Sequence, residues 1–182
     1  MNAEDLQFLL SQMEKNMDEA FYHSERVAVL CYVLAKELQL TDDESELVYF
    51  AGLFHEIGKI NISEKITYKD IPIDLEKFYP YFTKILLSFY NKNKQLEDII
   101  LKHCENFDGT GYPKGLMFEE IGLLPMIVRI SDCYDNHRIL GCSHNDAVKL
   151  LEEKANVIFS KQIIKPFISA VVSNDLQYEY LS

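Results

Sequence analysis

The chain has 182 residues, 48% of them hydrophobic, which is enough for one well-packed domain with a small N-terminal extension. Its formal charge of −11 excludes nucleic-acid polymers and anionic membranes as default partners, because both attract basic surfaces. No apolar run approaches the roughly 20 residues of a membrane-spanning helix, and the acidic start is unlike a signal peptide. We therefore expect a cytoplasmic protein, and its four cysteines without paired spacing predict reduced thiols.

Nearly every segment has the periodicity of an amphipathic α-helix. Residues 3–17 form a short amphipathic stretch, which we assign to an N-terminal helical extension covering residues 1–19. The following helix buries one face over residues 27–38, and His23 lies one turn earlier on that face. The main domain is then expected to cover residues 20–182.

The capping box Thr41-Asp42-Asp43-Glu44 predicts the start of a third helix. The inner face of this helix includes His55, so we expect that side chain to point into the core. Gly58 is placed to end the helix. Residues 60–73 are predicted to form a turn, because Ile71-Pro72 would break any helix there.

The second half of the chain is also helical, apart from one loop at residues 108–113 that is rich in glycine. The pattern predicts helices at about 74–91, 94–105, 123–136, from Ser143 through Leu151, and 162–173. No segment has the alternation of a convincing strand. The chain is therefore predicted to adopt an all-α fold of about seven to nine helices.

Five polar residues fall on otherwise apolar helix faces, where burial costs several kcal/mol unless the groups are paired or bind a cation. They are His23, His55, Glu56, His103 and Asp132. Mixed nitrogen and oxygen donors suit Fe, Mn, Co or Zn, and such a set can assemble between packed helices. The sequence therefore predicts a metal site inside the helical domain.

A purely structural interpretation of the same residues is also open. Asp132 would then pair with Arg129 or Arg26, and His55 would bond to a backbone carbonyl. Either arrangement would satisfy the buried groups without a metal ion.

Four segments together resemble the HD-GYP domain family. Residues 102–113 (KHCENFDGTGYP) resemble the family's signature segment, whose typical form is HHExxDGxGYP. Residues 23–27 resemble the early HSxRV element, residues 55–59 resemble HDxGK, and residues 128–135 resemble the late ADxxDA helix. The motifs occur in the family's order over roughly residues 20–173, so the resemblance is specific.

The resemblance implies an HD-domain-like helical bundle that encloses two or three metal ions, usually iron or manganese. Its usual activity is hydrolysis of cyclic di-GMP or a related cyclic dinucleotide, in which the metals activate water and hold the phosphate oxygens. Carried over by motif, one metal would bind to His23, His55, Glu56 and Asp132. A second metal would share Glu56 and add His103.

The resemblance also assigns residues to the substrate. Lys59 would be the catalytic lysine that faces the phosphate and neutralises its charge. The glycine-rich loop would border the substrate through Asp108, Gly109, Gly111 and Tyr112.

This chain departs from the family pattern at the metal-binding positions. Glu56 stands where the family has aspartate, Tyr79 replaces a histidine before a proline, and Cys104 replaces the second histidine of the HH pair. The basic element after the ADxxDA helix is shortened to residues 136–141. Tyr79 and Cys104 are thus positions of a weakened second site, where they either act as unusual ligands or pack as ordinary buried side chains.

These departures lead to two functional hypotheses. The first is a divergent HD-GYP-like protein of cyclic-dinucleotide signalling with at most one well-formed metal site, whose hydrolysis of cyclic di-GMP is impaired or lost. The alternative is an active metal-dependent phosphodiesterase on cyclic di-GMP or another nucleotide phosphate ester. We expect Fe or Mn, one ion rather than two, or no ion at all in a purely scaffolding protein. The expected partners are a cyclic dinucleotide or other small phosphate ester, a signalling protein, and a second copy in a homodimer.

Overall fold

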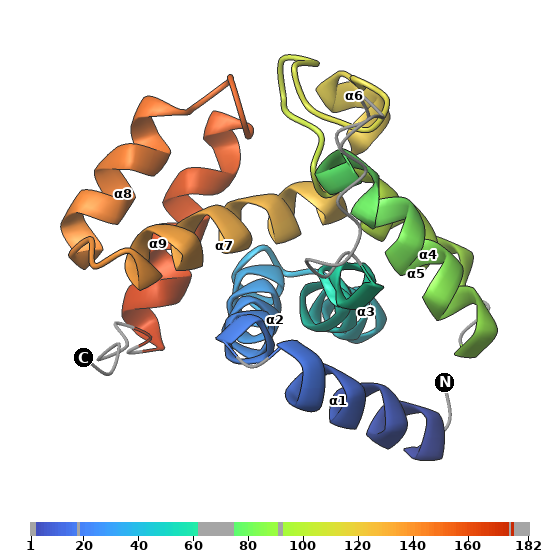
Figure 1. The fold of residues 1–182 in the computed structure, drawn as a ribbon. Coiled ribbons are helices and arrows are strands. Elements are labelled where there is room, and N and C mark those ends of the chain that lie inside the picture. The colour runs from blue at the N-terminus through green and yellow to red at the C-terminus, as the bar shows by residue number, and fades with distance from the viewer. Residues whose placement is uncertain (1–2, 18, 62–74, 91–92, 175, 177–182) are drawn as a thin grey trace.

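The fold is seen in a computed structural model that describes residues 3–17, 19–61, 75–90, 93–174 and 176 (Figure 1). In this part of the chain no strand is present, and two isolated β-bridges are the nearest approach to one. The all-α prediction of about seven to nine helices is confirmed. The described helices are α1 (Ala3–Met17), α2 (Glu19–Glu37), α3 (Asp42–Phe54), the 3-10 helices η1 (Ile57–Asn61) and η2 (Leu75–Phe78), α4 (Tyr79–Tyr90), α5 (Lys94–Lys102), α6 (Phe118–Ile121), α7 (Leu123–Ile139), α8 (His144–Glu153) and α9 (Lys161–Ser173).

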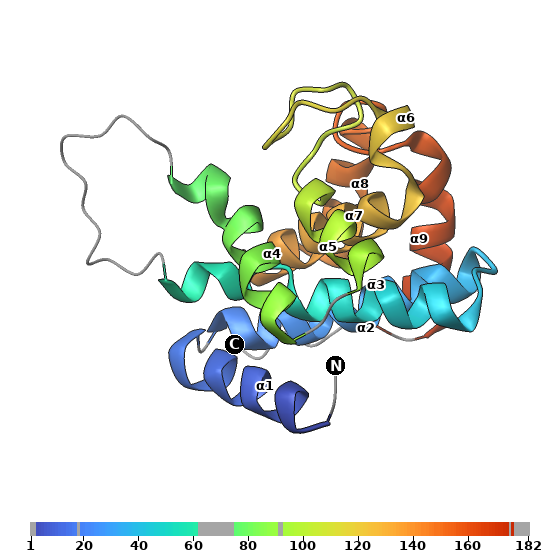
Figure 2. The same ribbon diagram turned by 90° about the vertical axis from the view of Figure 1, so that its right-hand side faces the viewer.

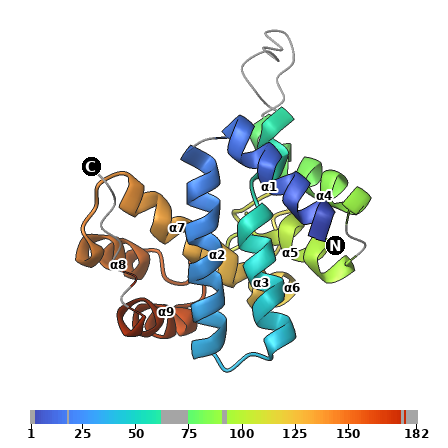
Figure 3. The ribbon, with the colours of Figure 1, turned by 90° about the horizontal axis from the view of Figure 1, so that it is seen from below.

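The helices are arranged around a central pair. Helices α2 and α3 lie side by side, as the view from below shows (Figure 3), and α7 packs across both of them. Helices α4 and α5 lie on one side of this centre and α8 and α9 on the other (Figure 1). The loop between α5 and α6 lies on the side of the molecule opposite α1 (Figure 2). None of the described helices combines the length and apolar character that a membrane span requires.

The predicted apolar face of α2 forms the centre of the core. Val27, Leu30 and Leu34 are completely buried, and α1 contributes the buried residues Leu9 and Met13 to the same cluster. Full burial of such a side chain contributes about 1.5–3 kcal/mol to stability. The boundary at residue 20 between extension and main domain stays a prediction.

The predicted capping box at the start of α3 is confirmed. The backbone N–H of Glu44 donates to Thr41 Oγ1 at 3.2 Å, and the Thr41 N–H donates to the Glu44 carboxylate at 3.0 Å. These two bonds satisfy backbone donors that have no partner within the helix.

The prediction that Gly58 ends this helix is wrong. Helix α3 ends at Phe54, and Gly58 lies inside the 3-10 helix η1. A Cβ atom at Gly58 would lie 2.5 Å from the Thr83 backbone nitrogen and 2.6 Å from the Tyr79 carbonyl oxygen. The glycine is needed because α4 approaches the backbone of η1 closely, which brings Tyr79 next to the end of α3.

Other boundaries shift by a few residues. The predicted turn at residues 60–73 lies mostly outside the described residues. Helix α5 ends at Lys102, three residues before the predicted end, because Glu105 turns inward and accepts the backbone N–H groups of Lys114 (2.7 Å) and Leu116 (3.0 Å). These two bonds fold the following loop back onto the end of α5.

Candidate metal centre

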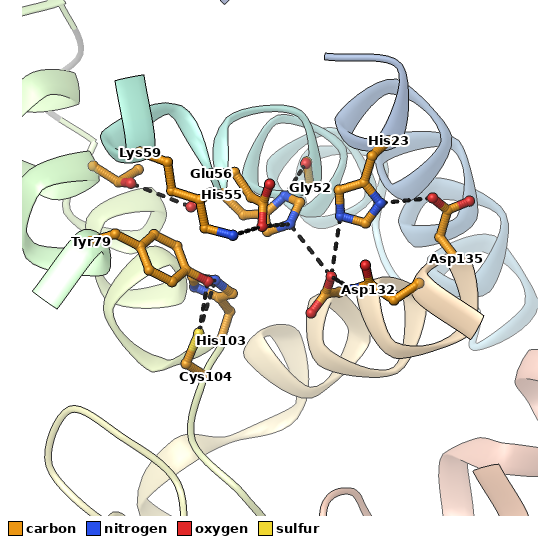
Figure 4. A network of polar contacts seen from close by, with 12 residues as sticks. His23, Gly52, His55, Glu56, Lys59, Tyr79, His103, Cys104, Asp132 and Asp135 are labelled. Carbon is orange, nitrogen blue, oxygen red and sulfur yellow. Dashed lines mark hydrogen bonds and ion pairs between the residues drawn. The ribbon is translucent and has the colours of Figure 1, made fainter. Parts of the chain in front are cut away.

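Three buried histidines from three helices form a row in the middle of the domain (Figure 4). His23 lies on α2, and His55 and His103 are the residues that cap the C-terminal ends of α3 and α5. The ring centroids of His23 and His55 are 5.3 Å apart, and those of His55 and His103 are 5.4 Å apart. The tertiary structure thus brings together side chains that are far apart in the chain.

The first two histidines each have one nitrogen held by the protein and one nitrogen left open. The Nδ1–H of His55 donates to the Gly52 carbonyl at 2.7 Å, and the Nδ1–H of His23 donates to the Asp135 carboxylate at 2.7 Å. Both Nε2 atoms are buried, and neither makes a hydrogen bond within the described residues. An imidazole that is oriented through Nδ1 and has an open Nε2 is the usual form of a metal-binding histidine.

Two carboxylates face these open nitrogens. Asp132 Oδ1 lies 3.2 Å from His23 Nε2 and 3.7 Å from His55 Nε2, and Glu56 Oε1 lies 3.9 Å from His55 Nε2. His23, His55 and Glu56 offer three ligand atoms that all lie within 4.8 Å of one another. Four of the five predicted metal ligands are therefore neighbours.

The charges at this cluster suit a cation. Burial raises the pKa of both acids, but His55, Lys59 and His23 outweigh this effect and hold the pKa of Glu56 below its usual range. For Asp132, contacts with His23 and His55 overcome burial and hold the pKa well below its usual range. Two ionised carboxylates and two imidazoles form a donor set that fits a divalent transition metal. The residues present therefore fit a metal ion.

The structural interpretation of the same residues is correct only in part. His55 does bond to a backbone carbonyl, but this contact uses Nδ1 and leaves Nε2 open. Arg26 pairs with Asp135 rather than with Asp132. Arg129 does pair with Asp132, but as an ion pair without a hydrogen bond, since Nη1 lies 3.7 Å from Oδ2.

Asp135 is a further residue of this site, and its role does not follow from the sequence. Its carboxylate accepts His23 Nδ1–H and two hydrogen bonds from Arg26, from Nε at 2.9 Å and from Nη2 at 3.0 Å. The available signal was its position, since it follows Asp132 by three residues on α7 and so lies on the same helix face. Asp135 orients the His23 ring.

We expect Asp135→Asn to weaken Mn²⁺ binding about 10–100-fold, because carboxylates that orient a ligating histidine typically contribute this much to metal affinity. Titration followed by the electron paramagnetic resonance signal of free Mn²⁺ measures the change. Asp98→Asn, which removes a carboxylate paired with Lys102 on the surface of α5, is the matched control. Equal affinities of Asp135→Asn and wild type would show that Asp135 does not act through His23.

Metal binding is also expected to depend on pH. Burial lowers the pKa of His23, but its contacts with Asp132 and Asp135 raise it to about 9. In the metal-free protein His23 is therefore protonated at neutral pH, and its proton competes with the cation. Mn²⁺ affinity should rise about tenfold per pH unit between pH 6.5 and 8. Over the same range the metal-free protein should lose stability, because a raised pKa stabilises the fold only while the group is protonated. Mn²⁺ titrations and thermal melts at several pH values test both trends.

The third histidine is engaged differently. His103 Nδ1–H donates to the Ile100 carbonyl at 2.6 Å, so its Nε2 is an acceptor. That acceptor receives the hydroxyl hydrogen of Tyr79 at 2.8 Å, and Cys104 Sγ lies 2.9 Å from the same hydroxyl oxygen. The Nε2 atom is open in His23 and His55, but in His103 it accepts a hydrogen bond from Tyr79 (Figure 4).

This second group is electrically neutral. Burial lowers the pKa of His103 to about 4, raises that of Tyr79 well above its usual range and raises that of Cys104. At neutral pH the group therefore consists of an imidazole, a phenol and a thiol, and none of them is the ionised ligand that would attract a metal ion.

Lys59 borders the cluster on the solvent side. Its Nζ contacts Glu56 Oε1 and lies 4.7 Å from the centre of the Tyr79 ring, and its side chain is 42% exposed. The ammonium group is therefore both anchored to the cluster and open to a ligand from solution.

The glycine-rich loop lies beside the cluster without entering it. The Asp108 side chain accepts the N–H and hydroxyl of Thr110, and its backbone N–H donates to the Val157 carbonyl at 3.2 Å. Gly109 has a φ of 78°, and a Cβ at Gly111 would lie 2.2 Å from the Asn106 backbone nitrogen. The Tyr112 N–H donates to the Cys104 carbonyl at 3.2 Å, which ties the loop to the second group. Tyr112 is thus a residue predicted to bind substrate that also contacts this group.

Comparison with known proteins supports the resemblance to the HD domain family. A model of the HD domain family matches residues 8–162. The chain is 32% identical over 169 residues to the cyclic di-GMP phosphodiesterase PA4108 of Pseudomonas aeruginosa, and 29% identical over 166 residues to the cyclic di-GMP phosphodiesterase PdeB of Borreliella burgdorferi. Both alignments cover 86% of this chain but only 41% and 44% of the relatives. The chain thus spans less than half the length of these proteins.

Solved structures share the fold. A cyclic GMP-AMP specific phosphodiesterase of V. cholerae superimposes with a TM-score of 0.74 at 15% identity, covering 93% of this chain and 48% of that one. The HD domain of the phosphodiesterase PgpH of L. monocytogenes, in complex with cyclic-di-AMP, gives 0.61 at 14% identity and covers 96% and 99%. At these identities the likeness establishes the helical architecture.

Proposed function

This chain belongs to the HD domain family, and from that premise we propose that it is a divergent, HD-GYP-like protein of cyclic-dinucleotide signalling with one well-formed metal site. Its relatives named above act on cyclic di-GMP, which supports a cyclic dinucleotide as the ligand of this chain. We further propose that its hydrolysis of cyclic di-GMP is impaired or lost.

A single observation carries the proposal: the hydroxyl of Tyr79 donates a hydrogen bond to His103 Nε2 at 2.8 Å. This bond uses the lone pair through which His103 would bind a second metal. Catalysis by two metals stabilises both the attacking and the leaving oxygen of a phosphoryl transfer. A site that offers ligands for one ion can stabilise only one of these two oxygens, so we expect slow hydrolysis or none.

The first site keeps what binding requires. His23, His55, Glu56 and Asp132 would hold the ion, with Asp135 orienting His23. A bound divalent cation supplies a Lewis acid for a phosphate oxygen and lowers the pKa of water. Lys59 would contact the phosphate, because its ammonium group is exposed beside Glu56.

Metal content and turnover measured on the same sample test the proposal. The protein is reconstituted with Mn²⁺, or with Fe²⁺ under anaerobic conditions. Inductively coupled plasma mass spectrometry should then find one ion per chain. Chromatography of cyclic di-GMP incubations should find slow hydrolysis or none, while calorimetry detects binding. Two ions per chain with rapid turnover would overturn the proposal, and a chain that binds no ion would overturn its metal site.

The second candidate function is an active metal-dependent phosphodiesterase. The open Nε2 atoms of His23 and His55 favour it, because one ion can activate water by itself. One ion per chain together with rapid turnover of cyclic di-GMP, or of another nucleotide phosphate ester, would select this function over the first.

A further inference from the structure

Arg129 connects the candidate metal site to the glycine-rich loop. It lies on α7, three residues before Asp132, and its side chain is 20% exposed. Nη1 lies 3.7 Å from Asp132 Oδ2, and Nη2 donates to Asn106 Oδ1 at 3.1 Å. Asn106 in turn donates to Thr110 within the loop. The guanidinium therefore lies between the predicted metal ligands and the loop predicted to border the substrate.

Most of the donors of this guanidinium are not used. Arginine has five N–H donors, and within the described residues one of them makes a hydrogen bond, to Asn106. Nε is buried without a partner. Asp132 accepts no hydrogen bond from Arg129, because its Oδ1 accepts the Asn136 amide at 2.6 Å and its Oδ2 is too distant from Nη1. Asp132 thus offsets part of the charge of Arg129 without using its N–H donors, and an anion that accepted hydrogen bonds from them would satisfy these partly buried groups.

The charges around Arg129 are compatible with such an anion. The group next to Arg129 is the neutral set of Tyr79, His103 and Cys104. Burial raises the pKa of Tyr112 and of Cys104, and the positive charge of Arg129 opposes both rises. Arg129 is thus a cation beside the Tyr79–His103–Cys104 group, and Lys59 lies over the Tyr79 ring at 4.7 Å.

We propose that Arg129 is a phosphate-binding residue of this site, whose guanidinium binds the non-bridging oxygens of a phosphodiester beside the Tyr79–His103–Cys104 group. Its planar fork matches a phosphate bidentately, which the ammonium of Lys59 does not. Arg129 thereby provides the positive charge that a second metal would otherwise supply to the ligand. This inference rests on the proposed function.

The variant Arg129→Gln tests the inference, because glutamine can keep the bond to Asn106 while the charge is lost. Cyclic di-GMP should bind about 10–100-fold more weakly to the Mn²⁺-saturated variant, since two charge-assisted hydrogen bonds are lost. Mn²⁺ itself should bind at least about threefold more tightly, because a positive charge beside Asp132 is removed. The two affinities therefore move in opposite directions, which loss of structure would not produce. Calorimetry measures the dinucleotide, with the Michaelis constant replacing it if the ligand is hydrolysed.

Two further variants complete the test. Arg129→Lys keeps the charge but loses the fork, so dinucleotide binding should weaken severalfold while Mn²⁺ affinity stays unchanged. Lys149→Gln removes one exposed charge from α8 and should change neither affinity. If Arg129→Gln and Arg129→Lys both bind the dinucleotide as the wild type does, the inference is overturned and the proposed function stands. If the wild type binds neither Mn²⁺ nor cyclic di-GMP, the proposed function is overturned and the inference with it.

Discussion

The double substitution Tyr79→His with Cys104→His is expected to raise the metal content from one ion per chain to two. Tyr79 now donates its hydroxyl hydrogen to His103 Nε2, and Cys104 is a buried neutral thiol. Replacing both would release that nitrogen and add two imidazoles next to it. The attacking and the leaving oxygen would then each be stabilised by a cation. Cyclic di-GMP hydrolysis should therefore accelerate on the order of 100-fold.

Plasma mass spectrometry and cyclic di-GMP turnover measure the two effects on one preparation. Tyr79→Phe is the matched control, because it removes only the hydroxyl and adds no ligand. It should keep one ion per chain and lose about 0.5–1.5 kcal/mol of stability, since His103 Nε2 loses its hydroxyl donor and keeps only the Cys104 thiol, 3.2 Å away. A double variant that folds and still binds one ion would show that Tyr79 and Cys104 do not occupy the place of a second site.

The substitution His55→Gln is expected to have the second-largest effect, a loss of Mn²⁺ affinity on the order of 100–1,000-fold. His55 is completely buried, and its open Nε2 faces Glu56 and Asp132 at 3.9 and 3.7 Å. Gly52 holds the ring through Nδ1 in one orientation, which directs Nε2 toward the two carboxylates.

Titration with Mn²⁺ at pH 8 measures this loss, and far-ultraviolet circular dichroism checks that the variant is folded. His144→Gln is the control, because His144 lies on α8 and bonds to Tyr134 rather than to the cluster. If His55→Gln binds Mn²⁺ as tightly as His144→Gln, the candidate metal centre is wrong.

Much of the fold could be predicted because helices leave a periodic pattern in the sequence. The apolar spacing from Val27 to Leu34 predicts the buried face of α2, and the capping box predicts the first residue of α3. Both are local effects, decided within one or two helical turns. The end of α3 could not be predicted in this way, since Gly58 is required by the approach of α4, which is distant in the chain.

The metal ligands likewise divide into features that the local sequence predicts and features that depend on contacts between distant residues. Polar residues on apolar faces singled out His23, His55, Glu56 and Asp132, and the structure brings their side chains together. The role of Asp135 could not be inferred, because it depends on contacts with His23 and Arg26 more than one hundred residues away along the chain.

By itself the sequence predicted that the chain is helical and which side chains are candidate metal ligands, and its resemblance to the HD-GYP family marked Tyr79 and Cys104 as departures from the family pattern. Only the tertiary structure decided which nitrogen atoms remain open, because a hydrogen bond depends on where a distant partner lies. Gly52 and Asp135 leave Nε2 open on His55 and His23, whereas Tyr79 closes it on His103. The same donor type is therefore available in two histidines and occupied in the third.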